Sequence, residues 1–215
     1  MQSKLNGALG GVLRRVGVVP VLTIERAEDG VPVARALLAG GLGAIEVTLR
    51  TTAAIEAIRR IRAELPDAFV GAGTVLTPEQ GRDAIAAGAK FIVSPGMTPR
   101  LIQAAETWPV PFLPGAVTAS EAMALADLGY SVLKFFPAEP SGGVAALKAL
   151  AAPLTGIAFC PTGGIDAVKA RDYLALPTVA AIGGSRMVAA TAVVARDWAT
   201  IERLATEAAA LKPVR

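Results

Sequence analysis

The sequence predicts an α/β fold, namely a (β/α)8 TIM barrel with an additional N-terminal helix, and three observations support it. Eight short apolar runs alternate with segments rich in alanine, leucine and charged residues at helical spacing. The runs are almost continuously apolar, which is typical of parallel strands covered by helices. Glycine recurs between a helix and the following strand, at residues 40, 88 and 129, where a left-handed helix end favours it.

In chain order, a first helix is expected at residues 1–15, across the bottom of the barrel. Strands are expected at residues 18–22, 44–48, 69–72, 91–94, 111–113, 132–135, 157–160 and 179–182. Helices are expected at residues 31–39, 53–64, 78–87 and 119–128, with a long final helix at 188–211. Thr77-Pro78 and Thr98-Pro99 resemble helix starts, with threonine as the N-cap and proline in the first turn.

The length and composition favour one well-filled domain. The chain has 215 residues, near the lower end of the ~200 to 400 residues of such barrels, so the loops must be short. With 53% hydrophobic and 18% charged residues, disorder is excluded. No linker or change in composition marks a second domain. We therefore expect residues 1–215 to form a single (β/α)8 barrel domain.

The composition also excludes several classes of function. No apolar stretch reaches ~18 residues, and the N-terminus has no long apolar segment, so we expect an untargeted cytoplasmic protein without a membrane partner. With no histidine and a single cysteine, Cys160, neither a disulfide nor a metal site is expected, and no cofactor is implied. A net charge of +3 without a basic run does not indicate nucleic-acid binding.

Lys134 lies inside the apolar run at residues 132–136, near the end of a predicted strand. Lysine is depleted from strand interiors and is rarely buried without a partner. One interpretation is that its stem covers apolar surface while the ammonium stays in water. The other is a nucleophile, because desolvation favours a neutral amine that can form a Schiff base with a carbonyl. Lys90 precedes a similar run but lies at the N-terminal end of its strand, whereas barrels carry their catalytic residues at the C-terminal ends.

Glu46 interrupts the apolar run at residues 44–47. The alternation that turns Glu46 and Lys134 inward turns their apolar neighbours outward. Glu46 is either the partner of a core arginine or the proton shuttle that Schiff-base chemistry requires. Arg50, after the same strand, is either solvated or positioned to hold a substrate carboxylate through two parallel hydrogen bonds. Thr74, after the third strand, is an ordinary loop hydroxyl unless a ligand lies near it.

Two glycine-rich turns follow the last two predicted strands, at residues 160–166 and 182–186. A single Gly-Gly is usually a tight turn. In many barrels, however, the loops after strands 7 and 8 bind phosphate through free N–H groups and a helix N-terminus. The sequence therefore predicts that an anionic phosphate binds at these two turns, and residues 141–143 could join them.

Taken together, the runs EVTLRT at 46–51, GAGTVL at 71–76, SPG at 94–96, KFFPAE at 134–139 and CPTGGI at 160–165 resemble the bacterial 2-dehydro-3-deoxy-phosphogluconate (KDPG/KHG) aldolases. The resemblance covers at least residues 18–185. It implies a class I aldolase, usually a homotrimer, on a (β/α)8 barrel. Such an enzyme cleaves the phosphorylated 2-keto acid 2-dehydro-3-deoxy-6-phosphogluconate to pyruvate and glyceraldehyde 3-phosphate in the Entner-Doudoroff pathway.

The same resemblance implies roles for individual residues. Lys134 matches the Schiff-base lysine and Glu46 the general acid/base. The residues implied to bind substrate are Arg50, Thr74, Pro95, Phe136, Thr162, Gly163, Gly164, Gly184 and Ser185. Among these, Arg50 and Thr74 match contacts to the pyruvyl half, and the glycine loops match the phosphate end. Residues 115–118 and 185–187 depart from the family pattern, and Arg186 leaves selectivity at the phosphate end open.

Alternatives remain at this point. The same chemistry could act on 4-hydroxy-2-oxoglutarate or on 2-dehydro-3-deoxy-6-phosphogalactonate. A phosphosugar isomerase would use the phosphate loops and a carboxylate but would need no carbonyl-attacking lysine. A non-catalytic phosphosugar-binding barrel would keep the loops and show no turnover.

Overall fold

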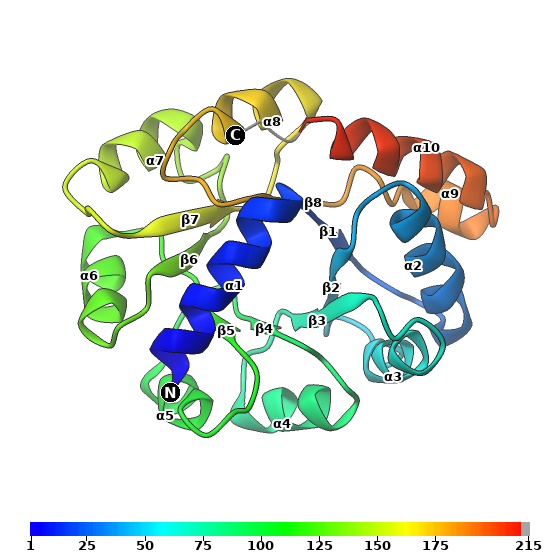
Figure 1. Cartoon of the computed structure of the whole chain (residues 1–215), viewed down its shortest axis with the longest axis horizontal. Helices are drawn as coiled ribbons and strands as arrows, with labels where there is room; N and C mark the ends of the chain where they lie inside the picture. The colour runs from blue at the N-terminus through cyan, green and yellow to red at the C-terminus, as the bar shows by residue number, and fades with distance from the viewer. Residues whose placement is uncertain (212–215) are drawn as a thin grey trace.

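The computed structural model describes residues 1–211, in which helix α1 (Gln2–Val16) precedes an alternation of strands and helices (Figure 1). The strands are β1 (Val18–Leu22), β2 (Ala44–Thr48), β3 (Phe69–Gly73), β4 (Ile92–Val93), β5 (Phe112–Leu113), β6 (Val132–Phe135), β7 (Ala158–Pro161) and β8 (Ile182–Gly184). The helices after β1 are η1 (Ala27–Asp29), α2 (Gly30–Ala39), α3 (Ala54–Glu64), α4 (Pro78–Ala86), α5 (Pro99–Ala105), α6 (Ala119–Asp127), α7 (Gly143–Ala151), α8 (Ala167–Leu174), α9 (Ala190–Val194) and α10 (Trp198–Ala209). Thr77 and Thr98 accept hydrogen bonds from the first turns of α4 and α5, which confirms the predicted N-caps.

The strands form a curled parallel sheet inside a ring of helices (Figure 1). Hydrogen-bonded ladders make a six-stranded sheet of order β5-β4-β3-β2-β1-β8 and a two-stranded sheet of β6 and β7. Three single-residue pairings connect the two sheets: Gly115 with Lys134, Phe159 with Val179, and Thr162 with Gly183. The uninterrupted eight-stranded ladder that the sequence predicts is therefore absent from residues 1–211.

The chemistry of β5 explains one of the two breaks. This strand has only two residues, and Pro111 and Pro114 flank it. Proline has no N–H to donate to a ladder, so the strand cannot extend its pairing in either direction. The contact to β6 is reduced to the N–H of Lys134, which donates to the carbonyl of Pro114 at 2.8 Å, and the adjoining Gly115 pairing.

Strand alternation divides the apolar side chains into two clusters. The inner cluster lies within the curled sheet and contains Val19, Leu113 and Val132, with Leu9 and Leu13 of α1. The outer cluster lies between strands and helices and contains both neighbours of Glu46 and both neighbours of Lys134. The predicted inward orientation of these two charged residues is confirmed. Each fully buried aliphatic side chain stabilises this arrangement by roughly 1.5–3 kcal/mol.

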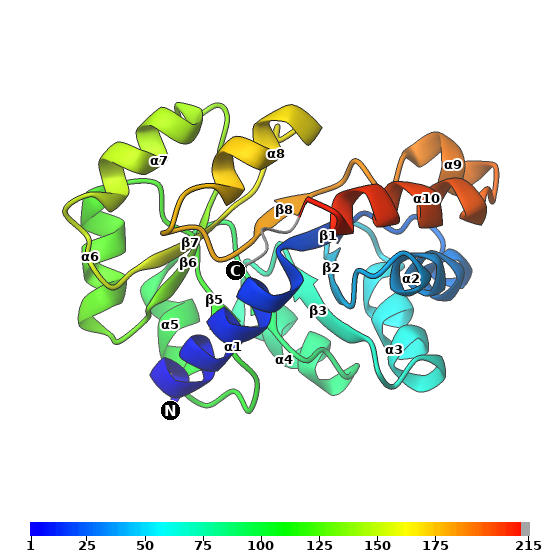
Figure 2. The ribbon, with the colours of Figure 1, turned by 45° about the horizontal axis from the view of Figure 1, so that its top comes forward.

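Helix α1 crosses the N-terminal ends of the strands, as the sequence predicts (Figure 2). The buried Asn6 side chain donates to the carbonyls of Phe112 and Val132 and accepts from the N–H groups of Ser131 and Val132, each at 2.9 Å. Gln2 accepts from the N–H of Phe112 at 3.0 Å. Because Phe112 belongs to β5 and Val132 to β6, the Asn6 amide bridges the two sheets where their ladder is interrupted.

The single helix predicted at residues 188–211 is wrong. The chain leaves α9 at Arg196, whose φ of 53° lies in the left-handed region, and α10 begins immediately afterwards. Asp197 accepts from the N–H of Thr200 at 3.0 Å and so caps α10. The eighth strand also begins three residues later than predicted, and Val179 lies outside it in an isolated bridge with Phe159. Helix α10 then packs along α2 (Figure 2).

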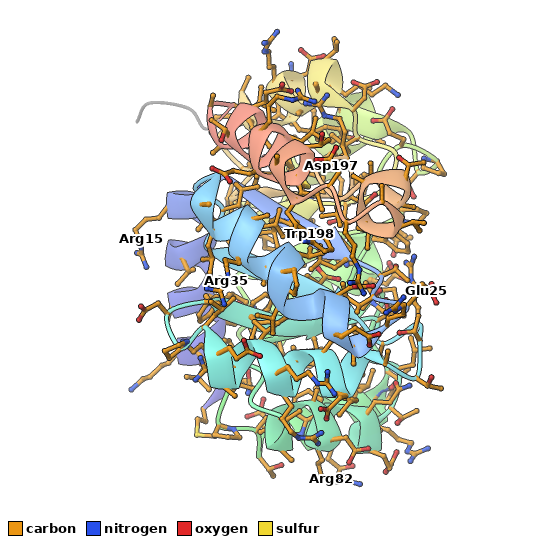
Figure 3. The ribbon with its side chains drawn as sticks, turned by 90° about the vertical axis from the view of Figure 1, so that its right-hand side faces the viewer. Arg15, Glu25, Arg35, Arg82, Asp197 and Trp198 are labelled. Atoms are coloured by element: carbon orange, nitrogen blue, oxygen red, sulfur yellow. The ribbon has the colours of Figure 1, made fainter. Side chains whose placement is uncertain are left out.

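A large groove lies outside the sheet, between α2, α3 and α10. It has a volume of about 800 Å³, and Arg35 and Trp198 line it (Figure 3). None of its lining residues comes from the C-terminal end of a strand. It is therefore separate from the residues predicted to carry chemistry. No helix within residues 1–211 is long and apolar enough to cross a membrane.

We expect Asn6→Ala to lower the free energy of unfolding by about 3 kcal/mol, because buried backbone groups of β5 and β6 would lose their partners. Urea denaturation followed by circular dichroism measures this change. Lys4→Ala, at an exposed position of the same helix, is the matched control and should cost less than about 0.5 kcal/mol. Equal losses in the two variants would mean that Asn6 does not hold the sheets together.

Candidate active site

Lys134 of β6 and Glu46 of β2 meet inside the curled sheet. Lys134 Nζ donates to Glu46 Oε1 at 3.0 Å, and the two side chains are only 6% and 5% exposed. The two strands are not neighbours, so the ion pair spans the interior and links the two sheets. Loss of either partner would leave an unpaired buried charge, which typically costs about 3–5 kcal/mol. This cost keeps the two charged groups together.

Gly73, the last residue of β3, makes room for the carboxylate. A Cβ atom at this position would lie 2.0 Å from Glu46 Oε1 and 2.6 Å from its Cδ, far inside contact distance. Gly73 has no predicted role, because the chain alone does not show which side chain will face it. The only signal is a glycine at a strand exit, next to a predicted site residue.

Thr74 follows with a φ of 57°, which is unusual for a β-branched residue. Such strain persists only where the surrounding structure imposes it, and it is common at binding sites. The close packing of Gly73 against Glu46 places Thr74 near the ion pair. The family resemblance implied a substrate contact for Thr74, and its left-handed backbone distinguishes it from an ordinary loop threonine.

Cys160 of β7 is paired in register with Lys134 and is buried. Burial raises the pKa of the thiol to about 12, while the charges of Lys134 and Glu46 act on it in opposite directions. The thiol is thus protonated at neutral pH and is a poor nucleophile, since the thiolate is the reactive form. Cys160 packs beside the ion pair without competing with the lysine for an electrophile.

A cavity of about 370 Å³ lies at the glycine-rich loops; Lys134 and Glu46 are not among its lining residues, and Phe136 connects it to the lysine. The ring of Phe136 forms part of its wall, and Lys134 Nζ lies 5.4 Å from the centroid of this ring. The predicted substrate-binding residues that line the cavity are Arg50, Phe136, Thr162, Gly163, Gly164, Gly184 and Ser185. Arg50 makes no hydrogen bond or ion pair within residues 1–211, so its guanidinium is available to a ligand.

Thr74 and Pro95 do not line this cavity. The carbonyl oxygen of Pro95 would lie 2.1 Å from a Cβ at Gly115, and Gly115 pairs with Lys134. Pro95 therefore lies close to the strand of the lysine, and Thr74 lies close to the carboxylate. The structure gathers the predicted residues in two groups: one beside the ion pair, and one at the glycine-rich loops.

The glycine-rich loops after β7 and β8 approach each other closely. A Cβ at Gly183 would lie 2.3 Å from Thr162 Oγ1, so only glycine permits the pairing of these two residues. Gly163 and Gly164 have φ angles of 106° and 77°, which glycine adopts without strain. Within the described chain, the N–H groups of Gly163, Gly164 and Ser185 donate no backbone hydrogen bond, so they are free to bind an anion.

Two charged residues that were not predicted to bind substrate also line the cavity, Asp166 and Arg186. Asp166 caps α8 and accepts from the N–H groups of Val168 and Lys169 at 2.9 Å. The aspartate before a helical stretch was a usable N-cap signal, whereas Arg186 was visible only as a departure from the family pattern. Residues 1–211 contain no group of three or more His, Cys, Asp or Glu side chains that could hold a metal ion.

We expect the Cys160 thiol to resist alkylation in the folded protein at pH 8, because burial shields the thiol and raises its pKa to about 12. Iodoacetamide labelling followed by mass spectrometry measures the rate. Denaturant should restore the rate of a free thiol, which serves as the internal control. Rapid labelling of the folded protein would show that Cys160 is neither buried nor protonated.

Comparison with known proteins supports one family. Residues 9–204 match the family model of KDPG and KHG aldolase. The chain is 51% identical to the KHG/KDPG aldolase of Escherichia coli K12 over 191 residues, 89% of this chain and 90% of that protein.

Solved structures agree. The KDPG aldolase of Legionella pneumophila, with pyruvate captured at low pH as a covalent carbinolamine intermediate, superimposes with a TM-score of 0.90 at 43% identity, covering 93% of this chain and 97% of that one. The aldolase of Zymomonas mobilis ZM4 with 3-phosphoglycerate gives 0.89 at 46% identity, covering 95% and 96%. With these identities extending over nearly its whole length, the chain belongs to the KDPG and KHG aldolase family.

Proposed function

We propose that this chain is a class I aldolase that cleaves 2-dehydro-3-deoxy-6-phosphogluconate to pyruvate and glyceraldehyde 3-phosphate, in the Entner-Doudoroff pathway. The observation that carries the proposal is the buried contact of Lys134 Nζ with Glu46 Oε1 at 3.0 Å. Phe136, whose ring Lys134 Nζ approaches, also lines the cavity with free N–H groups. The pyruvate carbinolamine of the Legionella relative supports the same chemistry, because a carbinolamine forms when an amine adds to a carbonyl carbon.

The first half of the reaction forms the Schiff base. Glu46 accepts a proton from the Lys134 ammonium, and the neutral amine adds to the C2 ketone of the substrate. Glu46 then returns a proton to the hydroxyl of the carbinolamine, which leaves as water. The product is an iminium ion that joins C2 to Lys134. Glu46 can exchange protons with the reacting nitrogen because it already contacts it.

The second half breaks the carbon-carbon bond. Removal of the C4 hydroxyl proton by Glu46 lets the C3–C4 bond break, and its electron pair moves into the iminium as an enamine. Glyceraldehyde 3-phosphate leaves with the new carbonyl at the former C4. Protonation of C3 by Glu46 and addition of water to the imine then release pyruvate and restore Lys134. Each proton that the carboxylate accepts is used in the following step.

The remaining residues bind the two ends of the substrate. Arg50 lines the cavity without a partner in the described chain and is suited to the C1 carboxylate. Thr74, Pro95 and Phe136 surround the pyruvyl half near Lys134. At the other end, the phosphate is held by Thr162, Gly163, Gly164, Gly184 and Ser185. In this proposal the cavity of about 370 Å³ holds one small substrate.

The higher-order organisation is also part of the proposal. The single-residue pairings between the two sheets support a closed (β/α)8 barrel rather than two independent sheets. Residues 1–215 would form that single domain, although residues 212–215 lie outside the described residues. The homotrimer, the cytoplasmic location and the absence of membrane or nucleic-acid partners stay predictions.

Related substrates are the main alternatives. The Escherichia coli relative is named for both KHG and KDPG, which favours 4-hydroxy-2-oxoglutarate as a second substrate of the same lysine. That acid carries no phosphate and would leave the glycine-rich loops unused. A lactate dehydrogenase assay of pyruvate release tests the proposal directly. The acids to compare are 2-dehydro-3-deoxy-6-phosphogluconate, 2-dehydro-3-deoxy-6-phosphogalactonate and 4-hydroxy-2-oxoglutarate. Absence of pyruvate from all three acids would overturn it.

We expect Lys134→Arg to abolish turnover, because a guanidinium stays protonated and cannot form an imine. Sodium borohydride with pyruvate should add a covalent adduct to the wild-type protein at Lys134 and none to the variant. Lys90→Arg is the matched control, since Lys90 also precedes an apolar strand but donates to the carbonyl of Pro66 at 3.0 Å. An adduct on Lys90, or activity in Lys134→Arg, would contradict the assignment.

We expect Gly73→Ala to slow turnover by a factor of about 10² or more, within the range of ~10² to 10⁴ expected for Glu46→Gln. The new methyl group would displace the Glu46 carboxylate, whose Oε1 lies 2.0 Å from the Cβ position. Gly43→Ala is the matched control, because no heavy atom lies within 4 Å of its Cβ position.

If Gly73 acts through Glu46, the double variant Gly73→Ala/Glu46→Gln should be no slower than Glu46→Gln alone. Turnover is measured by pyruvate release in each variant. Independent, multiplying losses would mean that Gly73 affects the reaction by another route.

A further inference from the structure

The cavity carries two charged residues at its loop end that the proposed reaction does not use. Asp166 follows β7 and Arg186 follows β8, and both line the cavity with the glycine-rich loops. A phosphate bound at these loops would meet a carboxylate as well as a guanidinium. The balance between these two charges should therefore affect which substrates bind.

Asp166 opposes an anion at this end. Its carboxylate accepts from the N–H groups of Val168 and Lys169 at 2.9 Å, so these donors at the start of α8 are already occupied. The hydrogen bond from Lys169 is the main cause that holds the pKa of Asp166 below its ordinary value, and the charge of Arg186 acts in the same direction. The carboxylate is ionised at neutral pH and repels a phosphate dianion.

Arg186 is held in place by a weak contact. Its Nη2 lies 3.3 Å from Glu207 Oε2 of α10, and the two side chains are 42% and 46% exposed. Exposed ion pairs of this kind contribute little stability. Glu207 also pairs with Arg203 at 2.5 Å, so it keeps a cationic partner when Arg186 moves away. The guanidinium can thus exchange one carboxylate for a stronger, doubly charged ligand.

We propose that Arg186 is a specificity-determining residue, whose guanidinium leaves Glu207 to pair with the phosphate of the substrate and offsets the charge of Asp166. The inference rests on the proposed function and deepens it. Backbone N–H groups of the loops position the phosphate, and Arg186 supplies the charge that favours phosphorylated 2-keto acids over unphosphorylated ones. Glu207 competes with the phosphate for the same guanidinium and so limits the preference.

The test compares two substrates in the full-length enzyme at low ionic strength. The quantity measured is the ratio of kcat/KM for 2-dehydro-3-deoxy-6-phosphogluconate to kcat/KM for unphosphorylated 2-dehydro-3-deoxygluconate. Arg186→Gln should lower this ratio by about tenfold, the effect of losing one charge-assisted contact. Arg186→Lys should lower it less, because lysine keeps the charge but loses the planar fork. The wild-type preference should also weaken as salt is added.

Variants of α10 separate this role from a general effect of charge. Arg203→Gln removes an equal positive charge outside the cavity lining. It leaves Arg186 as the remaining partner of Glu207 in the described chain, so it should lower the ratio, but clearly less than Arg186→Gln does. Glu207→Gln should raise the ratio by freeing Arg186. That gain should disappear in the double variant Arg186→Gln/Glu207→Gln, since the guanidinium that benefits is absent.

Two outcomes would overturn the inference: equal losses on both substrates in Arg186→Gln, or a gain from Glu207→Gln that survives in the double variant. Equal effects of Arg186→Gln and Arg203→Gln on the ratio would also overturn it, because they would reflect net charge alone. Failure of the proposed function is distinguishable from these results. In that case the wild-type protein would release no pyruvate from either acid.

Discussion

The contact between Lys134 and Glu46 is the constraint on which the rest of the structure depends. Two charges removed from water are tolerated only when they are held together, and their strands are not neighbours. The pair can form only because the sheet curls, so that β2 faces β6 across its interior. The inner apolar cluster fills the space beneath the pair, and Asn6 of α1 joins the sheets at the opposite end. The fold thus brings together two side chains that are 88 residues apart.

The rim of the site depends on three glycines, which have no side chain. Cβ atoms at Gly73, Gly115 and Gly183 would lie 2.0, 2.1 and 2.3 Å from their nearest neighbours. These neighbours are the carboxylate of Glu46, the carbonyl of Pro95 and the hydroxyl of Thr162. Each glycine thus allows a polar atom to approach a strand end directly. Where the strands stop, the space between them is lined by hydrogen-bonding groups instead of apolar side chains.

The sequence alone could predict the features that local chemistry determines. The strands at residues 18–22, 44–48 and 132–135 have the expected bounds, and Gly17, Gly43 and Ser131 mark their starts. Lys134 and Glu46 could be identified because a charge inside an apolar run is anomalous. The late start of β8 could not be predicted, since residues 179–181 are as apolar as a strand. Only their hydrogen bonds determine whether they belong to the ladder. The break near Arg196 carried a local signal in Asp197, but the helical composition on both sides concealed it.

Buried and exposed charges also differ in what a sequence can reveal about them. Lys134 and Glu46 stand out in the sequence because each is a charge inside an apolar run. Arg50 and Arg186 resemble any solvated loop arginine until the cavity is known. The same difference separates their roles. A buried pair on two strands fixes the reacting atoms, because any displacement leaves a charge unpaired. An exposed guanidinium on a loop can change partners at little cost. Substrate preference can therefore be altered at the loops without disturbing the lysine and carboxylate on which the chemistry depends.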